Sequence, residues 1–492
     1  MPLDIKSQAI SGMIWTGVER FGTQFIHFVT EIVIARILVP ADFGIIAMLS
    51  IFMAVAQSFL DSGFANALIQ KKDRTQIDYS TVFYFNILVA VLLYIILYLT
   101  APLIAAFYNM PILTEVTRIY TLSLIFNGLT IVQTAKLSIE LNFRTQAIAS
   151  IISIILAGSL GIFLAYRNYG VWALVAQGVA IAGIRMLVLW FKSSWKPLLV
   201  FSYSSFRQLF SFGSKLLASG MINTIYQNLY SIVIGKFFSA SSLGFFNRAE
   251  KFASLPTMSI TQIVLKVNFP ILSKYQDDDV KLISIYKRLL RAPIFILYPS
   301  LLGMAALANP LIEVVLGAKW LPCVPLLQIL CVGYIWGPLT HINLNLLYVK
   351  GRSDLVLKLE LIKKPFAFLL LFASIPLGLM WVCVGKAIYE FIAFAFNCYY
   401  TKKILNYGIT EQFHDIYKII INSVVMVGVV IVVTYFFKDP ILKVCIGIMV
   451  GILVFVVLSF LSKDSTFNEL LSMVTSKQSG CRFFFAGKKQ ED

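Results

Sequence analysis

The sequence predicts an all-α polytopic membrane protein, and three observations carry that prediction. Of the 492 residues, 59% are hydrophobic and only 13% are charged, whereas soluble domains have roughly 45–50% apolar and about 25% charged residues. The apolar residues form continuous runs of roughly 20, long enough to cross a bilayer as helices. They do not alternate with polar residues, as the strands of a membrane barrel do.

About fourteen such runs follow one another along the chain. The expected spans are 13–37, 43–65, 81–105, 115–136, 147–166, 169–191, 208–234, 245–269, 289–309, 324–347, 361–377, 379–400, 417–437 and 440–461. The weakest is 361–377. The N-terminal "MPLDIKSQAISGM" lacks the apolar core and small-residue cleavage site of a signal peptide, so we expect the first span to stay.

Lysine and arginine set the expected orientation. If the N-terminus lies inside, roughly 27 basic residues fall in inside loops, against about six in outside loops and about eight within spans. Cytoplasmic loops carry this excess in membrane proteins, so both termini are expected in the cytoplasm. Anionic lipid headgroups account for the formal net charge of +17, and nothing in the sequence calls for nucleic acid.

A repeated phrase indicates internal symmetry. Residues 32–44 read "IVIARILVPADFG", and residues 232–244 read "IVIGKFFSASSLG". Each phrase ends the first span of a six-span half and turns into the second. The inside loops "LNFRTQ" (141–146) and "KGRSDL" (350–355) also occupy matching places. Parallel repeats place a pseudo-symmetry axis along the membrane normal, with the substrate path between the halves.

The runs "AISGMIWTGVERFGTQFIHFVTEIVIARILVPADFGIIAM" (9–48) and "DSGFANALIQKKDRTQIDYSTVFYFN" (61–86) resemble the opening of bacterial polysaccharide transporters. These are the lipid-linked oligosaccharide flippases of the multidrug/oligosaccharidyl-lipid/polysaccharide exporter superfamily. The resemblance covers the whole chain in topology and is most specific over roughly the first 145 residues. It implies two six-helix bundles around a central cavity, followed by two extra C-terminal helices.

The expected organisation combines the repeat with that resemblance: an N-terminal lobe (1–200), a C-terminal lobe (201–405), two additional helices (406–465) and a cytoplasmic tail (466–492). The family's role implies the substrate, an undecaprenyl-pyrophosphate-linked glycan moved from the inner to the outer leaflet of the bacterial inner membrane. Other membrane proteins of polysaccharide assembly are candidate partners, and the chain is expected to be a monomer.

Several kinds of chemistry find no support in the sequence. No G-x-x-x-x-G-K-[ST] phosphate loop occurs, so an ATP motor within this chain is excluded. Scattered cysteines and three histidines offer no metal-ligand spacing, and no cofactor is expected. The longest outside loop, near 309–321, carries only Glu313 and Lys319 as charged groups, which disfavours a membrane polymerase or ligase.

Charges inside the spans are the main candidates for function, because they are costly in lipid. Arg20 lies in span 1 and Lys215 at a similar depth in span 7, while Arg248 and Lys251 lie one turn apart in span 8. Arginine offers a fork for phosphate oxygens and lysine a compact point charge. We therefore predict that these four cations bind the pyrophosphate.

A structural interpretation of the same cations remains open. Glu19, Asp61 and Glu250 would then pair with them and hold helices together, with Asp61 reaching Arg20. Asp61 and Glu31 are also candidates for proton coupling, although membrane potential and Na⁺ are equally open as driving forces.

Two further polar groups lie within spans. Lys386 and Glu390 are spaced i,i+4 in span 12 and are predicted either to pair or to line the cavity. Asn223 and Gln227 share a helical face with tyrosines and are candidates for hydrogen bonding to sugars, with inter-helix bonding as the alternative.

The predicted function is thus a flippase working by alternating access. The main alternative is an exporter of drugs or small metabolites on the same scaffold, which the positive charge of the predicted cavity disfavours because exporters of cationic drugs prefer acidic cavities.

Overall fold

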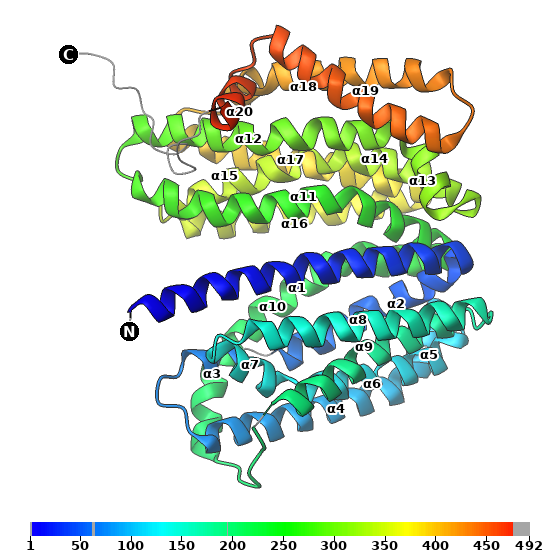
Figure 1. Cartoon of the computed structure of the whole chain (residues 1–492), viewed down its shortest axis with the longest axis vertical. Helices are drawn as coiled ribbons and strands as arrows, with labels where there is room; N and C mark the ends of the chain where they lie inside the picture. The colour runs from blue at the N-terminus through cyan, green and yellow to red at the C-terminus, as the bar shows by residue number, and fades with distance from the viewer. Residues whose placement is uncertain (1, 62–63, 194, 476–492) are drawn as a thin grey trace. The chain divides into compact units, whose positions relative to one another are not determined.

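The computed structural model describes residues 2–61, 64–193 and 195–475. Some side chains within its helices also lie outside the description: 2–10, 13, 66, 211–220, 222–223, 259, 262–263, 265–267, 470 and 472–475. Every regular element in the described ranges is a helix, as Figure 1 shows. The all-α prediction is confirmed. The chain divides into two compact units, Met1–Gly244 and Phe245–Asp492.

Ten helices lie wholly within the first unit among its described residues, and they differ widely in length. They are α1 (Pro2–Ile37), α2 (Pro40–Leu60), α3 (Phe64–Gln70), α4 (Gln76–Tyr108), α5 (Ile112–Tyr120), α6 (Leu122–Gly128), α7 (Ile131–Ile139), α8 (Phe143–Tyr166), α9 (Val171–Lys192) and α10 (Tyr203–Phe237).

Helix starts in the first unit follow from local capping chemistry. The Thr75 hydroxyl accepts the backbone N–H of Asp78, and the Asp78 carboxylate accepts the backbone N–H of Thr75, which forms a capping box at the start of α4. Asn142 and Ser202 cap α8 and α10 in the simpler way. Thr75 and Asn142 lie in loops predicted to be inside. These polar caps therefore mark the points where the chain leaves a loop and begins an apolar helix.

Helix α11 (Ala240–Lys274) leads into the second unit. The remaining elements are α12 (Asp279–Ala306), α13 (Ala308–Leu316), the 3₁₀ helix η1 (Ala318–Cys323), α14 (Val324–Tyr334), α15 (Gly337–Val349), α16 (Ser353–Ser374), the 3₁₀ helix η2 (Ile375–Leu377), α17 (Leu379–Leu405), α18 (Ile409–Tyr435), α19 (Pro440–Leu461) and α20 (Ser465–Thr475). Figure 1 draws α18 and α19 as a hairpin in orange, and α18 also packs along α12.

A buried amide cluster ties together three helices of the second unit. Asn343 of α15 and Gln412 of α18 exchange two hydrogen bonds of 3.0 and 2.8 Å, and the Thr401 hydroxyl of α17 donates to Asn343 at 2.7 Å. All three side chains are buried. Hydrogen bonds of this kind hold membrane helices together, because lipid offers no hydrophobic driving force between them.

Ten stretches of the described chain are long and apolar enough to cross a membrane, by length and composition. They match ten of the expected spans, from Pro40–Leu60 to Pro440–Leu461. The four other expected spans (13–37, 208–234, 245–269 and 361–377) lie on α1, α10, α11 and α16. The protein is a multi-pass membrane protein, whereas the count of fourteen and the lobe boundaries stay predictions.

Several of the expected spans are divided between helices, and in two of them the break lies well inside a run predicted to be one continuous helix. Span 115–136 is divided among α5, α6 and α7, with a break between Gly128 and Ile131. Span 324–347 is divided into α14 and α15, with a break between Tyr334 and Gly337. Pro338 follows the second break directly and cannot donate a backbone hydrogen bond to the preceding turn.

The two copies of the repeated phrase form matching turns. Helix α1 ends at Ile37 and α2 begins at Pro40, and helix α10 ends at Phe237 and α11 begins at Ala240. The copies also contact each other. A Cβ on Gly44 would lie 1.8 Å from the carbonyl oxygen of Ala240, and a Cβ on Gly244 would lie 2.1 Å from that of Pro40. Only glycine allows this backbone approach.

Candidate functional site

The predicted cation of span 1 is exposed. Arg20 follows Glu19 on α1, and the Glu19 carboxylate accepts a hydrogen bond of 2.6 Å from the Ser150 hydroxyl of α8. Gln227 is exposed on α10. The side chains of Lys215 and Asn223 lie outside the described residues, so their predicted roles stay predictions. Glu31 forms an i,i+4 pair with His27 at 3.3 Å, which gives this carboxyl a neighbour on its own helix.

The two predicted cations of span 8 lie in a more enclosed setting. Arg248 on α11 is only 7% exposed, and its guanidinium carbon lies 5.9 Å from the ring centroid of Trp320 in η1. Lys251, one turn further along α11, is half-buried. A guanidinium beside an aromatic ring in a poorly solvated place interacts strongly with an incoming anion.

Lys386 on α17 bridges to another helix. Its ammonium forms a salt bridge with the Glu250 carboxylate of α11, and the Tyr334 hydroxyl donates to the same carboxylate oxygen at 3.1 Å. The ammonium also lies 5.5 Å from the ring centroids of Phe246 and Tyr334. We call Glu250, Tyr334 and Lys386 the α11–α14–α17 cluster. Glu390 lies half-buried one turn away on α17 and also interacts electrostatically with Lys386, so the predicted Lys386–Glu390 pairing stays a prediction beside this interhelical bridge.

A second polar cluster lies in the first unit. The Gln57 amide on α2 donates to the Asp61 carboxylate at 3.0 Å, and the Asn127 amide on α6 donates to Gln57 at 3.1 Å. The guanidinium of Arg185 on α9 acts electrostatically on Asp61. Its Nε atom is buried and has no hydrogen-bond partner among the described atoms. We call these four residues the α2–α6–α9 cluster.

The two clusters occupy equivalent helices of the predicted repeat. Each takes its carboxylate from the second span of a half, its hydrogen-bonding group from the broken fourth span and its cation from the sixth. Asn127 precedes the break after Gly128, and Tyr334 directly precedes the break before Gly337. Broken helices at the membrane midplane are typical of substrate and ion sites in transporters.

Part of both clusters is not predicted from the sequence, because Arg185, Tyr334, Gln57 and Asn127 are not among the predicted site residues. One signal was available, because Gly337–Pro338 in the middle of an apolar run indicates a helix break. The interhelical partners themselves could not be predicted from spacing, because they join segments far apart in the chain.

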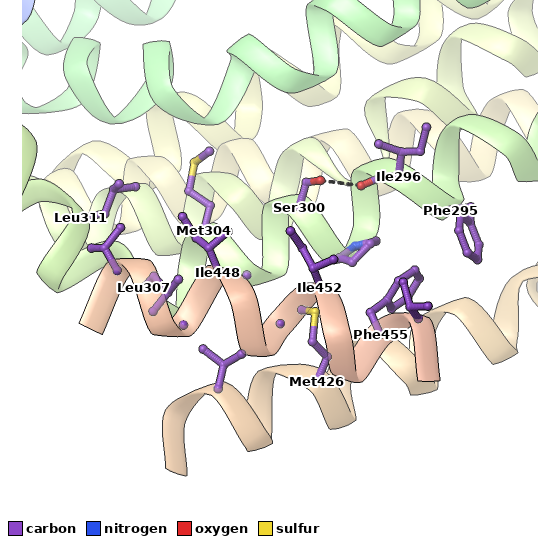
Figure 2. Close-up of a pocket in the computed structure, with 17 residues that line it drawn as sticks. Phe295, Ile296, Ser300, Met304, Leu307, Leu311, Met426, Ile448, Ile452 and Phe455 are labelled. Atoms are coloured by element: carbon purple, nitrogen blue, oxygen red, sulfur yellow. Dashed lines mark hydrogen bonds between the residues drawn. The ribbon is translucent and has the colours of Figure 1, made fainter. Parts of the chain in front are cut away.

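An apolar cavity of about 460 Å³ lies in the second unit among α12, α13, α18 and α19. Figure 2 shows Met304, Met426, Ile452 and Phe455 around it. The hydroxyl that lines it, from Ser300, donates to the Ile296 carbonyl at 2.6 Å and is therefore satisfied within its own helix. The cavity thus suits a hydrocarbon ligand.

Comparison with known proteins places the chain in a family. A family model described as "Polysaccharide biosynthesis protein" matches residues 33–325, which is more than half of the chain. The chain belongs to this family.

Relatives within curated proteins agree. The chain is 27% identical to "Teichuronic acid biosynthesis protein TuaB" of Bacillus subtilis (strain 168), over 95% of this chain and 98% of that protein. It is 24% identical to "Succinoglycan biosynthesis transport protein ExoT" of Rhizobium meliloti (strain 1021), over 94% and 95%. The fold is similar to that of "Lipid II flippase MurJ, inward closed conformation", with a TM-score of 0.75, 18% identity, and 92% and 99% coverage.

Proposed function

We propose that this protein is a flippase that moves an undecaprenyl-pyrophosphate-linked oligosaccharide, a repeat unit of O-antigen, capsule or exopolysaccharide, from the inner to the outer leaflet. Membership of the polysaccharide biosynthesis family carries the proposal. The relatives are named for the synthesis of cell-surface polysaccharides, and one of them is named a transport protein. The flippase whose fold this chain shares supports the same class of action.

The headgroup is proposed to bind to cations within the spanning helices. Arg248 is the strongest candidate because it is buried beside Trp320, and Lys251 lies one turn away. Arg20 in span 1 and Lys215 in span 7 are the proposed cations of the first span of each half. A pyrophosphate accepts several charge-assisted hydrogen bonds, so it gains most from guanidinium groups held in low dielectric. Gln227 and Asn223 are proposed to hydrogen bond with sugars.

The lipid part of the substrate has a proposed place as well. The cavity of about 460 Å³ among α12, α13, α18 and α19 is lined almost entirely by apolar side chains. A polyprenyl chain buries apolar surface there at roughly 25 cal/mol per Å². The cavity therefore supports a substrate that carries a long hydrocarbon tail.

The setting of the protein is proposed from the charge asymmetry of its loops. Both termini lie in the cytoplasm, and the membrane is a bacterial inner membrane.

The proposed lobes are 1–200 and 201–405. They are related by rotation about the membrane normal, and the protein works by alternating access as a monomer. We propose transport without catalysis. The alternative, an exporter of drugs or small metabolites, fits less well with Arg248 and Lys251 in an enclosed setting.

Lipid analysis of a deletion strain tests the proposed function. Deleting the gene in its host should cause the glycan-bearing polyprenyl pyrophosphate to accumulate, measured by mass spectrometry of extracted lipids. Complementation with Arg248→Ala should fail, and Arg248→Lys should restore export partly because it returns charge without the bidentate fork.

The matched control is Arg352→Ala. Arg352 precedes α16 in a loop and pairs with its neighbour Asp354 at 2.9 Å, with half of its side chain exposed, so this variant should complement fully. A deletion strain without accumulated glycan lipid would overturn the flippase assignment.

A further inference from the structure

We propose that the α11–α14–α17 cluster is a proton-linked phosphate site. In it, Lys386 exchanges its carboxylate partner Glu250 for a phosphate oxygen of the substrate, and the released Glu250 carboxylate takes up one proton from water. The proposal rests on the proposed function and extends it, because it assigns a second binding group and couples headgroup binding to proton uptake.

The position of the ion pair is the first argument. The side chain of Lys386 is 12% exposed and that of Glu250 is 26% exposed, within helices that span the membrane. Removing two charges from water costs several kcal/mol per ion, and apolar residues of similar size often serve stability as well or better. Charged groups inside membrane proteins therefore default to functional candidates.

The immediate surroundings favour exchange of partners. The Lys386 ammonium lies 5.5 Å from the ring centroids of Phe246 and Tyr334. These rings keep the local dielectric low beside an ammonium that carries three hydrogen-bond donors. Arg248 and Lys251 lie on the same helix as Glu250. They add positive charge to this part of α11, on faces of the helix other than the face that carries Glu250.

Charge balance explains why a proton accompanies the exchange. A phosphate oxygen at Lys386 would leave Glu250 as an uncompensated carboxylate in an apolar setting, which is strongly unfavourable. Protonation turns that carboxylate into a neutral hydrogen-bonding group, and no covalent bond other than O–H forms. A metal cation is disfavoured as the coupling ion, because the Lys386 ammonium already occupies the position beside Glu250.

The other titratable groups near Glu250 are consistent with this role. They are Lys386, Cys383 and Glu390 on α17 and Tyr334 on α14, each of which interacts electrostatically with it. Lys386 and, to a smaller extent, Lys363 of α16 act on Glu390, and Lys363 forms a salt bridge of 2.7 Å with Glu360. Glu250 is the carboxyl that both contacts Lys386 and accepts the Tyr334 hydroxyl.

The first unit supplies an independent parallel. Asp61 and Arg185 occupy the equivalent second and sixth spans, again with a hydrogen-bonding residue on the broken fourth span. A carboxylate and a cation beside a helix break therefore occur in both halves. The parallel lies in which helices supply the groups, because the two carboxylates stand at different depths along those helices.

Calorimetric titration of the purified full-length protein in lipid nanodiscs tests the proposal, with farnesyl pyrophosphate as the probe. Titrations in buffers of different ionisation enthalpy give the number of protons taken up per probe. Glu250→Gln should still bind the probe, with about one proton fewer taken up than by the wild type. Lys386→Met should bind at least tenfold more weakly, and the control Lys403→Met, at the exposed end of α17, should match the wild type.

Specific results would overturn the proposal. Equal proton uptake by Glu250→Gln and the wild type would exclude the exchange of partners. If Lys386→Met does not accumulate as a folded protein, the proton uptake of Glu250→Gln alone decides between the outcomes. Full probe affinity and proton uptake in the swapped variant Glu250→Lys with Lys386→Glu would indicate a structural brace. These outcomes leave the flippase assignment intact, since that assignment depends on the glycan lipid that accumulates in the deletion strain.

Discussion

The turn that joins the first two helices is built alike in both halves, whereas the polar cluster beside each helix break is not. In each half the first helix ends at Ile37 or Phe237 and the next begins at Pro40 or Ala240, and the two turns approach each other at Gly44 and Gly244. The clusters use the same three helices but different chemistry. In one, a contact ion pair is capped by a tyrosine hydroxyl. In the other, amides hold an exposed carboxylate near an arginine.

The clusters also differ in depth along their helices. Asp61 lies 21 positions after the first residue of α2 (61 minus 40), and Glu250 lies 10 positions after the first residue of α11 (250 minus 240). At about 1.5 Å per residue, the carboxylates differ in depth by about 16 Å along matching helices. The comparison teaches that close backbone packing constrains a repeat tightly, while its charged groups are free to diverge toward separate tasks.

The glycines of the matching turns should give the largest effect. Gly44→Val and Gly244→Val each place a Cβ within about 2 Å of a carbonyl oxygen, where backbone rather than a flexible side chain must move. We expect each to lower the free energy of unfolding by about 3 kcal/mol or more, the upper end for overpacking. Thermal unfolding in detergent measures this.

Gly428→Ala is the matched control for the glycine variants, because no heavy atom lies within 4 Å of its added Cβ. Alanine in a helix interior should be neutral or stabilising there. If Gly44→Val and Gly244→Val melt at the wild-type temperature, the close approach of the two turns does not exist as described.

Removing the carboxylates should produce a smaller and unequal pair of effects. Glu250→Ala leaves Lys386 without its salt-bridge partner in an enclosed setting, and breaking such a pair costs about 3 kcal/mol when the remaining charge cannot reach water. Asp61→Ala should cost less than about 1 kcal/mol because Asp61 is exposed. Equal losses in thermal unfolding would contradict the stated difference in enclosure.

The sequence predicted the spans and the family well, for physical reasons that apply locally. A bilayer imposes a minimum length of apolar helix, so runs such as 440–461 are recognised without any tertiary information. The predicted resemblance to polysaccharide transporters is confirmed by the family match over residues 33–325. The turn after Ile37 was also predicted correctly, because its copy after Phe237 lies at the same topological place.

The site was less predictable, because its contacts join distant segments. Glu250, Tyr334 and Lys386 come from three helices, and no spacing rule selects Glu250 over the nearer Glu390 as the partner of Lys386. The helix breaks matter equally. A span counted as one apolar run gives no reason to examine Tyr334 or Asn127, although each precedes a break that places it beside a charged helix.

The hydroxyl of Tyr334 should have the smallest effect, and it sharpens the comparison between the clusters. Tyr334→Phe removes one hydrogen bond of 3.1 Å to Glu250 and leaves the ring beside Lys386 in place. A single hydrogen bond to a charged group contributes about 1.5–3 kcal/mol at most, and about 1 kcal/mol where a nearby ammonium already satisfies the carboxylate. Asn127→Ala removes the corresponding bond to Gln57, and it should cost about 0.5–1 kcal/mol because both partners are neutral and partly accessible.

Thermal unfolding of the two variants, each combined with loss of its carboxylate, separates their contributions. Tyr334→Phe should lose its effect in a Glu250→Ala background, because the hydroxyl acts through that carboxylate. Asn127→Ala should keep most of its effect in an Asp61→Ala background, because Asn127 contacts Gln57 rather than Asp61. If both variants behave additively with their carboxylates, Tyr334 does not act through Glu250, and the two clusters are more alike than their geometry indicates.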